Sequence, residues 1–219
     1  MPRVGVFGGS FNPIHFGHLL LADQIVELLN LDRFLFVPAA EPPHKPAAGM
    51  APAADRLRMT TLAVADHPRF EVSDIELSRR GPSYTVDTLG ALATLGTLHL
   101  VIGSDSFLDL LTWRDPRRLA SRARLVVVPR TGRDFDPEDA GAQKVLSELG
   151  LAGFARVAEG SGAPTPDPAV VIVAEAMSLP LSGSDLRRRA REGRSLAYRM
   201  PGAVVEYINA RGLYGRTGA

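Results

Sequence analysis

Two histidines three residues apart follow a pair of glycines near the start of the chain. The stretch 8–18, GGSFNPIHFGH, comes directly after residues 3–7, a short apolar run typical of a buried strand. Residues 19–29 carry apolar side chains at helical spacing, so the glycines lie at a strand-to-helix turn and His15 and His18 share one face of the helix start. The free N–H groups of a helix N-terminus attract phosphate, and two imidazoles add hydrogen-bond donors. This pattern predicts phosphate chemistry.

Other interpretations of the same stretch differ in the ligand they predict. Two histidines at this spacing could bind a metal ion, but no third ligand is close by, and histidines on a helix are often structural. No Gly-Lys-Ser/Thr sequence follows, so the turn is not a P-loop, and it does not have the Gly-x-Gly-x-x-Gly spacing of a dinucleotide site. Gly17 leaves room for a ligand to approach the backbone.

Composition limits the class of protein. The 219 residues suffice for one sizeable α/β domain, and the formal net charge of +1 indicates no strong field for nucleic acid or membrane. The chain has no cysteine, which excludes disulfides and thiolate metal sites. It begins with a strand rather than a leader and has no apolar run of membrane-spanning length. We expect a cytoplasmic protein without nucleic-acid or membrane partners.

Strand and helix patterns alternate along most of the chain, which predicts a parallel sheet with helices on both faces. Residues 75–82 could include another edge strand, Ser83 is a plausible N-cap of the helix that follows it, and 153–168 is predicted to be a loop or a partly disordered segment. The expected strands span 3–7, 33–38, 70–72, 98–103, 125–130 and 169–174. The expected helices span 19–29, 55–65, 83–95, 107–111 and 137–149, and a further helix begins at Ser182.

Several later residues could also take part in phosphate or nucleotide binding. Lys45 is one of only two lysines and lies in a loop rich in proline and alanine, although a solvated turn is an equal alternative. Asp105 follows a buried strand, where open α/β sheets bind ligands, or it simply caps a helix. Trp113 is the only tryptophan. It could contact a nucleotide, or it could simply pack in the fold. Ser182 opens a basic helix that carries Arg187, but the charge is local and aromatic residues are sparse, so nucleic-acid binding is not predicted.

Residues 8–19 resemble the HxGH signature of the nucleotidyltransferase superfamily, and within it the opening of bacterial nicotinate mononucleotide adenylyltransferases. This motif alone does not distinguish these enzymes from pantetheine-phosphate, cytidylyl or synthetase relatives. Further similar motifs follow in order: PPHK at 42–45, RGPSYTVDTL at 80–89, GSD at 103–105, SGSDLR at 182–187 and a helix from Met200. The resemblance spans nearly the whole chain. One departure is Gly183, which stands where the family usually has Ser or Ala.

The resemblance implies a Rossmann-like nucleotidyltransferase fold, α/β in class, with a five-stranded parallel core sheet in the order 3-2-1-4-5. We expect a single domain over 1–219 with a small C-terminal helical part at about 182–219, and a homodimer is possible. The implied reaction is adenylyl transfer from ATP to nicotinate mononucleotide in NAD biosynthesis, with pyrophosphate released. Mg²⁺ would be held by ATP phosphates, with no metal ligands from the protein. The alternatives are another phosphorylated acceptor, nicotinamide mononucleotide or phosphopantetheine, and a non-catalytic ATP-binding regulatory module.

The same resemblance implies roles for individual residues. The implied catalytic residues are His15, His18, Lys45 and Arg187. The implied ATP-binding residues are Gly8, Gly9, Ser10, Phe11, His18, Gly103, Asp105, Arg130, Ser182, Ser184 and Arg187. The implied mononucleotide-binding residues are His44, Lys45, Tyr84, Thr85, Trp113 and Arg114, of which the tryptophan would stack on the pyridine ring.

Overall fold

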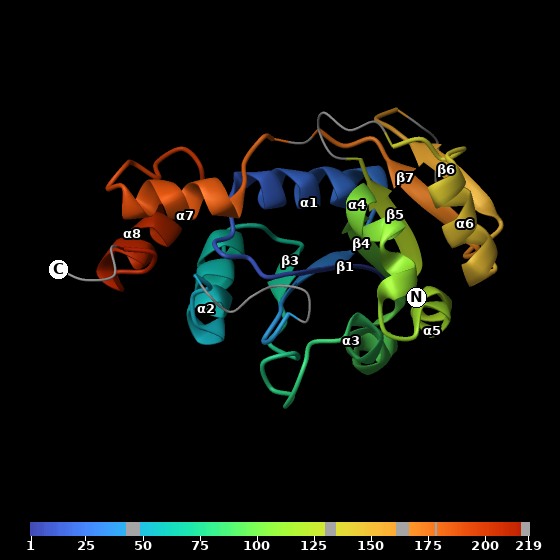
Figure 1. The fold of residues 1–219 in the computed structure, drawn as a ribbon, viewed down its shortest axis with the longest axis horizontal. Helices are drawn as coiled ribbons and strands as arrows, with labels where there is room; N and C mark the ends of the chain where they lie inside the picture. Colours follow the sequence, from blue (N-terminus) through green and yellow to red (C-terminus); the bar gives the residue numbers. More distant parts are fainter. Residues whose placement is uncertain (43–48, 130–134, 161–166, 178, 216–219) are drawn as a thin grey trace.

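The computed structural model describes residues 1–42, 49–129, 135–160, 167–177 and 179–215 (Figure 1). Within them, seven strands form one sheet in the order β3-β2-β1-β4-β5-β7-β6, and all neighbouring strands are parallel. The strands are β1 (Arg3–Gly9), β2 (Arg33–Pro38), β3 (Phe70–Val72), β4 (Thr97–Gly103), β5 (Arg124–Val128), β6 (Gly153–Val157) and β7 (Val170–Ala174).

Helices cover both faces of this sheet, with α1 on one side of β1 and α3 on the other (Figure 1). The α-helices are α1 (Phe16–Leu28), α2 (Ala53–Val64), α3 (Thr85–Leu92), α4 (Ser104–Leu108), α5 (Pro116–Arg122), α6 (Ala140–Leu149), α7 (Gly183–Arg191) and α8 (Gly202–Ala210). Short 3₁₀ turns follow α3 at Ala93–Leu95 and α4 at Leu110–Thr112. No helix among the described residues has both the length and the apolar character that a membrane span requires.

The sheet separates two hydrophobic core clusters because successive strand residues face opposite sides. In β2, Phe34 and Phe36 belong to the cluster that also contains residues of α1, α2, α7 and α8, whereas Leu35 and Val37 belong to the cluster that also contains residues of α3, α4, α5 and α6. The buried residues of α1 are Ala22, Ile25 and Val26, and with the C-cap residue Leu29 they have the spacing of one helix face. The same periodicities that predicted the elements from sequence therefore assign them to the two layers.

The predicted strand order 3-2-1-4-5 is confirmed, and two further strands, β7 and β6, extend the sheet beyond β5. The prediction of a loop over 153–168 is wrong at its start, because Gly153–Val157 pairs with β7 as an edge strand. The centroid of its Phe154 ring lies 5.6 Å from that of Phe107 and 5.7 Å from that of Phe135. A five-residue segment with a glycine and an arginine has no clear alternation, so its strand pairing depends on the open edge of β7.

The helix before residue 95 also differs from the prediction. Ser83 is not its N-cap: α3 begins at Thr85 after Tyr84, and the Ser83 hydroxyl accepts hydrogen bonds from the N–H groups of Ala40 and Glu41. Residues 75–82 form no strand in the structure. A turn begins just before them, where the Asp74 carbonyl accepts hydrogen bonds from the N–H groups of Leu77 and Ser78. Ser83 therefore joins the start of α3 to the loop that leaves β2.

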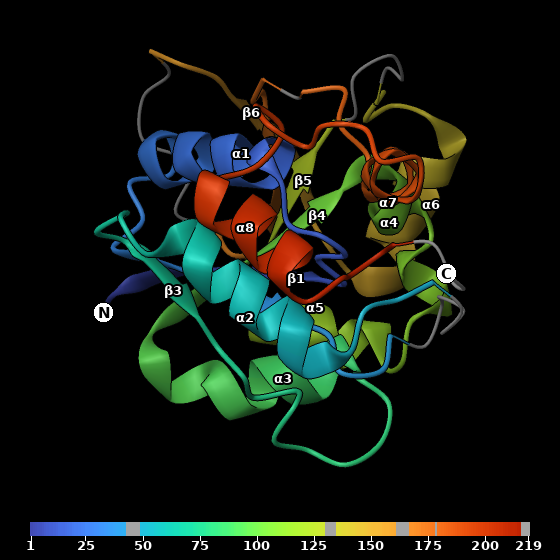
Figure 2. The same cartoon turned by 90° about the vertical axis from the view of Figure 1, so that its left-hand side faces the viewer.

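The last two helices pack back onto the first half of the chain. Figure 2 shows α8 lying beside α2, and the two helices are in contact. The Tyr207 hydroxyl donates a 2.7 Å hydrogen bond to Asp55 in the first turn of α2. Leu186 of α7 and Val204 and Ile208 of α8 belong to the core cluster that α1 shares with the sheet. The C-terminal helices are thus placed close to the loop between β1 and α1.

Candidate active site

The loop after β1 lies at the point where the strand order reverses. β1 pairs with β2 on one side and with β4 on the other, and the crevice at the carboxyl ends of such strands is where open α/β sheets bind ligands. The strand extends through Gly8 and Gly9, two residues further than the apolar run predicted. A Cβ atom at Gly8 would meet nothing within 4 Å. The backbone there is open to a ligand.

The two histidines stack on each other at the start of α1. Their ring centroids are 3.8 Å apart at an interplanar angle of 25°. His15 is the N-cap of the helix, and its backbone N–H donates to His18 Nδ1 over 3.3 Å. Because Nδ1 accepts this hydrogen bond, the proton of a neutral His18 ring lies on Nε2. His18 is thereby oriented to donate a hydrogen bond through Nε2.

His15 is held neutral by burial. Desolvation lowers the pKa of His15 to about 4, and its Nδ1 is buried without a hydrogen-bond partner among the described residues. A Cβ atom at Gly17 would lie 3.0 Å from that nitrogen, so Gly17 makes room for the His15 ring rather than for a ligand alone. At neutral pH, His15 can contribute a hydrogen bond but not a full positive charge.

We predict that the free energy of unfolding falls as the pH is lowered from 6.5 towards 4. Burial also lowers the pKa of His99 to about 4 from 6.5, so between these values the unfolded chain binds two protons that the folded protein does not bind at His15 and His99. Each histidine should cost about 2 kcal/mol at pH 5 relative to pH 7. Urea unfolding at the two pH values measures the change. His99→Gln should remove about half of it, and an unchanged pH dependence in that variant would contradict the assignment.

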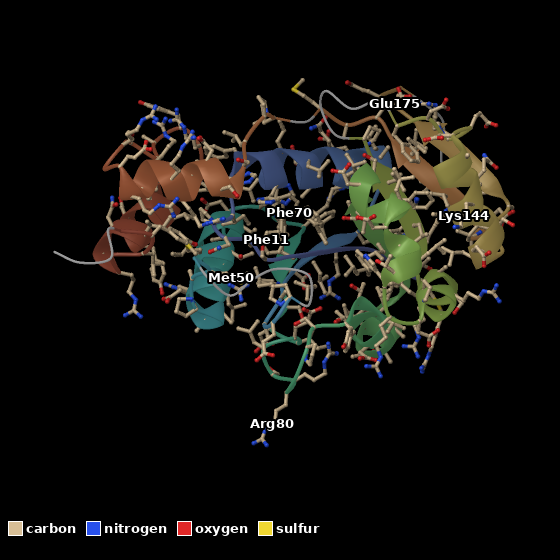
Figure 3. The ribbon with its side chains drawn as sticks, viewed as in Figure 1. Phe11, Met50, Phe70, Arg80, Lys144 and Glu175 are labelled. Carbon is tan, nitrogen blue, oxygen red and sulfur yellow. The ribbon has the colours of Figure 1, made fainter. Side chains whose placement is uncertain are left out.

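Phe11 supports His18 from the core. Its ring is buried, and its centroid lies 5.2 Å from that of the His18 ring and 5.8 Å from that of Phe36. Figure 3 shows Phe11 in the interior of the protein. A Cβ atom at Gly9 would come within 3.0 Å of this ring, so Gly9 permits the packing. The side chain of Phe11 therefore takes part in packing, and only its backbone remains available for a nucleotide.

A cavity of about 390 Å³ opens beside the loop. Gly8, Gly9 and Ser10 line one part, and the sequence-predicted Tyr84, Thr85, Trp113 and Arg114 line another. The Arg114 guanidinium lies 4.6 Å from the centre of the Tyr84 ring, a cation–π contact that brings positive charge to this end. Arg80, which belongs to the same sequence motif as Tyr84, is exposed and points away at the tip of its loop (Figure 3). The cavity joins the glycine-rich loop after β1 to an aromatic pocket.

Some residues of the cavity had no signal in the sequence. Glu76, Ser106 and Asp109 line it, and Glu76 is buried with Oε1 accepting a 2.6 Å hydrogen bond from Thr88. Asp105 lies in the first turn of α4 but is not among the residues that line the cavity, so its predicted ribose contact stays a prediction. Ser106 lies within α4 and Asp109 directly follows it, and neither was singled out from the sequence.

The start of α7 meets the loop between β1 and α1. Ser182 caps the helix by accepting from the Asp185 N–H, as predicted. The Arg187 guanidinium donates to the Asn12 carbonyl over 2.7 Å and to the Ser184 hydroxyl over 3.2 Å. A Cβ atom at Gly183 would lie 2.9 Å from the Asn12 carbonyl oxygen. The glycine that departs from the usual motif allows this close approach.

Arg56 is a buried residue that the sequence analysis missed. Only 1% of it is exposed, and its guanidinium donates to three backbone carbonyl oxygens, those of Ser10, Ala40 and Ala51. Burial lowers the pKa of this guanidinium. Arg56 thus ties the loop after β1 to the segment after β2, which leads into the predicted Lys45 loop.

The structure therefore brings two groups of predicted residues together. Gly8, Gly9 and Ser10 share the cavity with the aromatic residues at 84 and 113, and the α7 start contacts the loop after Ser10. Gly103 lies at the end of β4 with open space beside its Cα atom. His44, Lys45 and Arg130 lie outside the described residues.

The fold and this loop are those of a nucleotidyltransferase. The family model described as Cytidylyltransferase-like matches residues 6–189, and the chain belongs to this family. A curated protein of Thermus thermophilus, named "Probable nicotinate-nucleotide adenylyltransferase", is 44% identical over 215 residues that cover 97% of this chain and 99% of that protein. A Roseiflexus protein of the same name is 42% identical and covers 96% of this chain and 97% of its own length. Within the family, the chain belongs to the nicotinate-nucleotide adenylyltransferases.

Solved structures agree on the fold. Plasmodium falciparum nicotinic acid mononucleotide adenylyltransferase, solved in complex with NaAD, superposes with a TM-score of 0.71 at 18% identity, covering 98% of each chain. The same protein in complex with APC gives a TM-score of 0.68. At this identity the likeness extends to the fold and not to individual residues of the site.

Proposed function

We propose that this chain transfers the adenylyl group of ATP to nicotinate mononucleotide, forming nicotinate adenine dinucleotide and pyrophosphate. The observation that carries this proposal is the cavity that joins the glycines at the end of β1 to Tyr84, Thr85 and Trp113. A mononucleotide placed with its ring near Trp113 has its phosphate directed towards the loop that precedes the two histidines. The full-length similarity to curated relatives of this name supports the same acceptor.

The reaction needs positioning and charge stabilisation more than proton transfer. An oxygen of the mononucleotide phosphate attacks the α-phosphorus of ATP in line, and the bond from that phosphorus to the oxygen bridging to the β-phosphorus breaks. The nucleophile is already ionised at neutral pH, so no general base is required. The protein then has two tasks, to hold the two phosphates together and to stabilise charge on the leaving pyrophosphate.

The described residues suit these tasks. His18 offers its Nε2 proton, because its Nδ1 accepts from the backbone, and this donor can follow charge onto a leaving oxygen. Ser182, Ser184 and the first N–H groups of α7 form an anion-binding helix start beside Arg187. His15, neutral because its pKa is about 4, would act by hydrogen bonding. We assign Lys45 a phosphate contact on the sequence resemblance.

Mg²⁺ fits this site as an ion held by substrate. As the sequence resemblance implies, its oxygen ligands would be ATP phosphates and water. The bound ion would neutralise phosphate charge. We also propose a single domain with a helical C-terminal part and a cytoplasmic location, in keeping with the length of the chain and its lack of cysteine.

The proposed function is tested by incubating the protein with ATP, Mg²⁺ and a panel of phosphorylated acceptors. We expect pyrophosphate release only with a pyridine mononucleotide, together with nicotinate adenine dinucleotide detected by chromatography. Coupling to phosphopantetheine would assign a different acceptor. ATP binding without pyrophosphate release for any acceptor would instead indicate a regulatory module.

Gly183→Ala should lower kcat/KM for ATP by about tenfold, because small displacements of positioning groups are costly. The new Cβ atom would lie 2.9 Å from the Asn12 carbonyl oxygen and 3.3 Å from Arg187 Nη1, and a backbone oxygen cannot move aside without moving the loop. Steady-state kinetics with varied ATP measure the effect.

Gly202→Ala is the matched control. Gly202 is also the first residue of its helix, and a Cβ atom there meets nothing within 4 Å. Its kinetics should stay within about twofold of the original protein, while stability should rise by up to about 1 kcal/mol. Unchanged ATP kinetics in Gly183→Ala would show that the close approach of α7 is not needed.

A further inference from the structure

Four hydrogen bonds from three distant segments converge on Asn12, between the cavity-lining glycines and the two histidines. Its Oδ1 accepts from the Ala51 N–H over 3.0 Å and from the Tyr214 hydroxyl over 2.7 Å. Its Nδ2 donates to the Gly49 carbonyl over 3.3 Å, and its own carbonyl accepts from Arg187. Asn12 is 7% exposed. The position of this loop is therefore set by contacts from outside it.

Tyr214 is the most distant of these partners, 202 residues away in sequence. It lies beyond α8 near the end of the described chain and packs against the core cluster that contains Phe11 and Ile14. Its φ angle is +62°, in the left-handed region that a bulky residue rarely adopts. Burial raises the pKa of its phenol, so the hydroxyl keeps its proton and stays a donor at neutral pH.

The loop from Ser10 to His15 is too short to absorb a movement of Asn12. It connects β1, which ends at Gly9, directly to the N-cap of α1. A displacement of Asn12 would therefore move the helix start that orients His18, and also the carbonyl that holds Arg187. Through its hydrogen bond to Asn12, the Tyr214 hydroxyl is placed to influence the positions of both His18 and Arg187.

We propose that Tyr214 is a positioning residue for adenylyl transfer, whose hydroxyl holds Asn12 so that the histidine loop and Arg187 stay in register. This inference rests on the proposed function and goes beyond it, because it assigns a catalytic effect to the C-terminal segment. A purely structural role for Tyr214 would instead affect folding stability alone.

Tyr207→Phe provides a matched control for Tyr214→Phe. Both hydroxyls donate one 2.7 Å hydrogen bond to a side-chain oxygen, both tyrosines follow α7, and both pack on the same core cluster. The Tyr207 bond ends on Asp55, at the start of α2, rather than on the loop. Each variant loses one oxygen atom, so both should fold, which circular dichroism and thermal melting would verify.

We expect Tyr214→Phe to lower kcat/KM for ATP by about tenfold and to weaken binding of a non-hydrolysable ATP analogue severalfold in calorimetry. Tyr207→Phe should stay within about twofold in both measurements. The losses should persist at about 10–15 °C, far below the unfolding transition, where a difference in stability alone has no effect on rate.

Equal kinetics in the two variants would overturn the positioning role. The analogue titration needs no acceptor, so it tests Tyr214 even if nicotinate mononucleotide is not a substrate. Failure of the original protein to release pyrophosphate would overturn the proposed function, whereas normal turnover with equal variants would overturn only this inference.

Discussion

His18→Ala should lower kcat by a hundredfold or more while the protein stays folded. His18 orients its Nε2 donor from the first turn of α1, because its Nδ1 accepts the His15 N–H. Removal of one preorganised donor to a developing negative charge typically costs about 3–4 kcal/mol in the transition state. Single-turnover measurement of adenylyl transfer gives the chemical step directly.

His18→Asn separates catalysis from helix capping. The Asn Oδ1 can still accept the His15 N–H in place of Nδ1, but no donor remains at the Nε2 position. This variant should therefore be more stable than His18→Ala and equally slow. His67→Ala removes an imidazole that stacks on Phe70 and pairs with Asp23, away from the cavity, and should leave kcat within about twofold. A drop of less than tenfold in both His18 variants would make this histidine structural.

Nicotinate mononucleotide should be preferred over nicotinamide mononucleotide by at least about a hundredfold in kcat/KM, because a site built to pair with a carboxylate leaves its donors unpaired with an amide. The two acceptors differ only in that group. Tyr84 and Thr85 bring the start of α3 to the cavity, and no side chain caps its N–H groups among the described residues. The positive end of this helix and Arg114 both favour negative charge.

The acidic residues that line the cavity make this prediction a stringent one. Glu76 and Asp109 could accept from an amide NH₂, but one oxygen of Glu76 is already occupied by Thr88. If a carboxylate instead recognises the acceptor, nicotinamide mononucleotide will be used as well or better. Comparison of kcat/KM for the two acceptors decides between these outcomes.

Trp113→Ala tests the ring end of the same pocket. It should raise the KM for the mononucleotide by about tenfold through loss of stacking and change the KM for ATP much less. Tyr198→Ala is a suitable control, since Tyr198 is 96% exposed and does not line the cavity. A parallel rise in both KM values would indicate that Trp113 supports the fold rather than the acceptor.

The sequence by itself determined the local parts of this protein. The strand, turn and helix around His15 and His18 are contiguous, and glycine, apolar and helix-capping residues act over one or two turns, so their pattern predicts the phosphate loop directly. The same holds for Ser182 as the cap of α7, which the structure confirms. The alternating strands and helices predicted a parallel sheet with helices on both faces, whereas the order of its core strands was implied by the family resemblance.

Only the tertiary structure decided which distant residues complete the site. Arg187 and Tyr214 form hydrogen bonds to Asn12 across 175 and 202 residues of sequence. Arg56 donates hydrogen bonds to three backbone carbonyl groups. The Ser83 hydroxyl accepts a hydrogen bond from the loop after β2 instead of capping its own helix. Every residue has a backbone carbonyl group and every residue except proline has a backbone N–H group, so a side chain that binds them leaves no pattern in the sequence. The position of Glu76 in the cavity and the pairing of β6 with β7 also could not be predicted from sequence, because each depends on a surface formed by other parts of the chain.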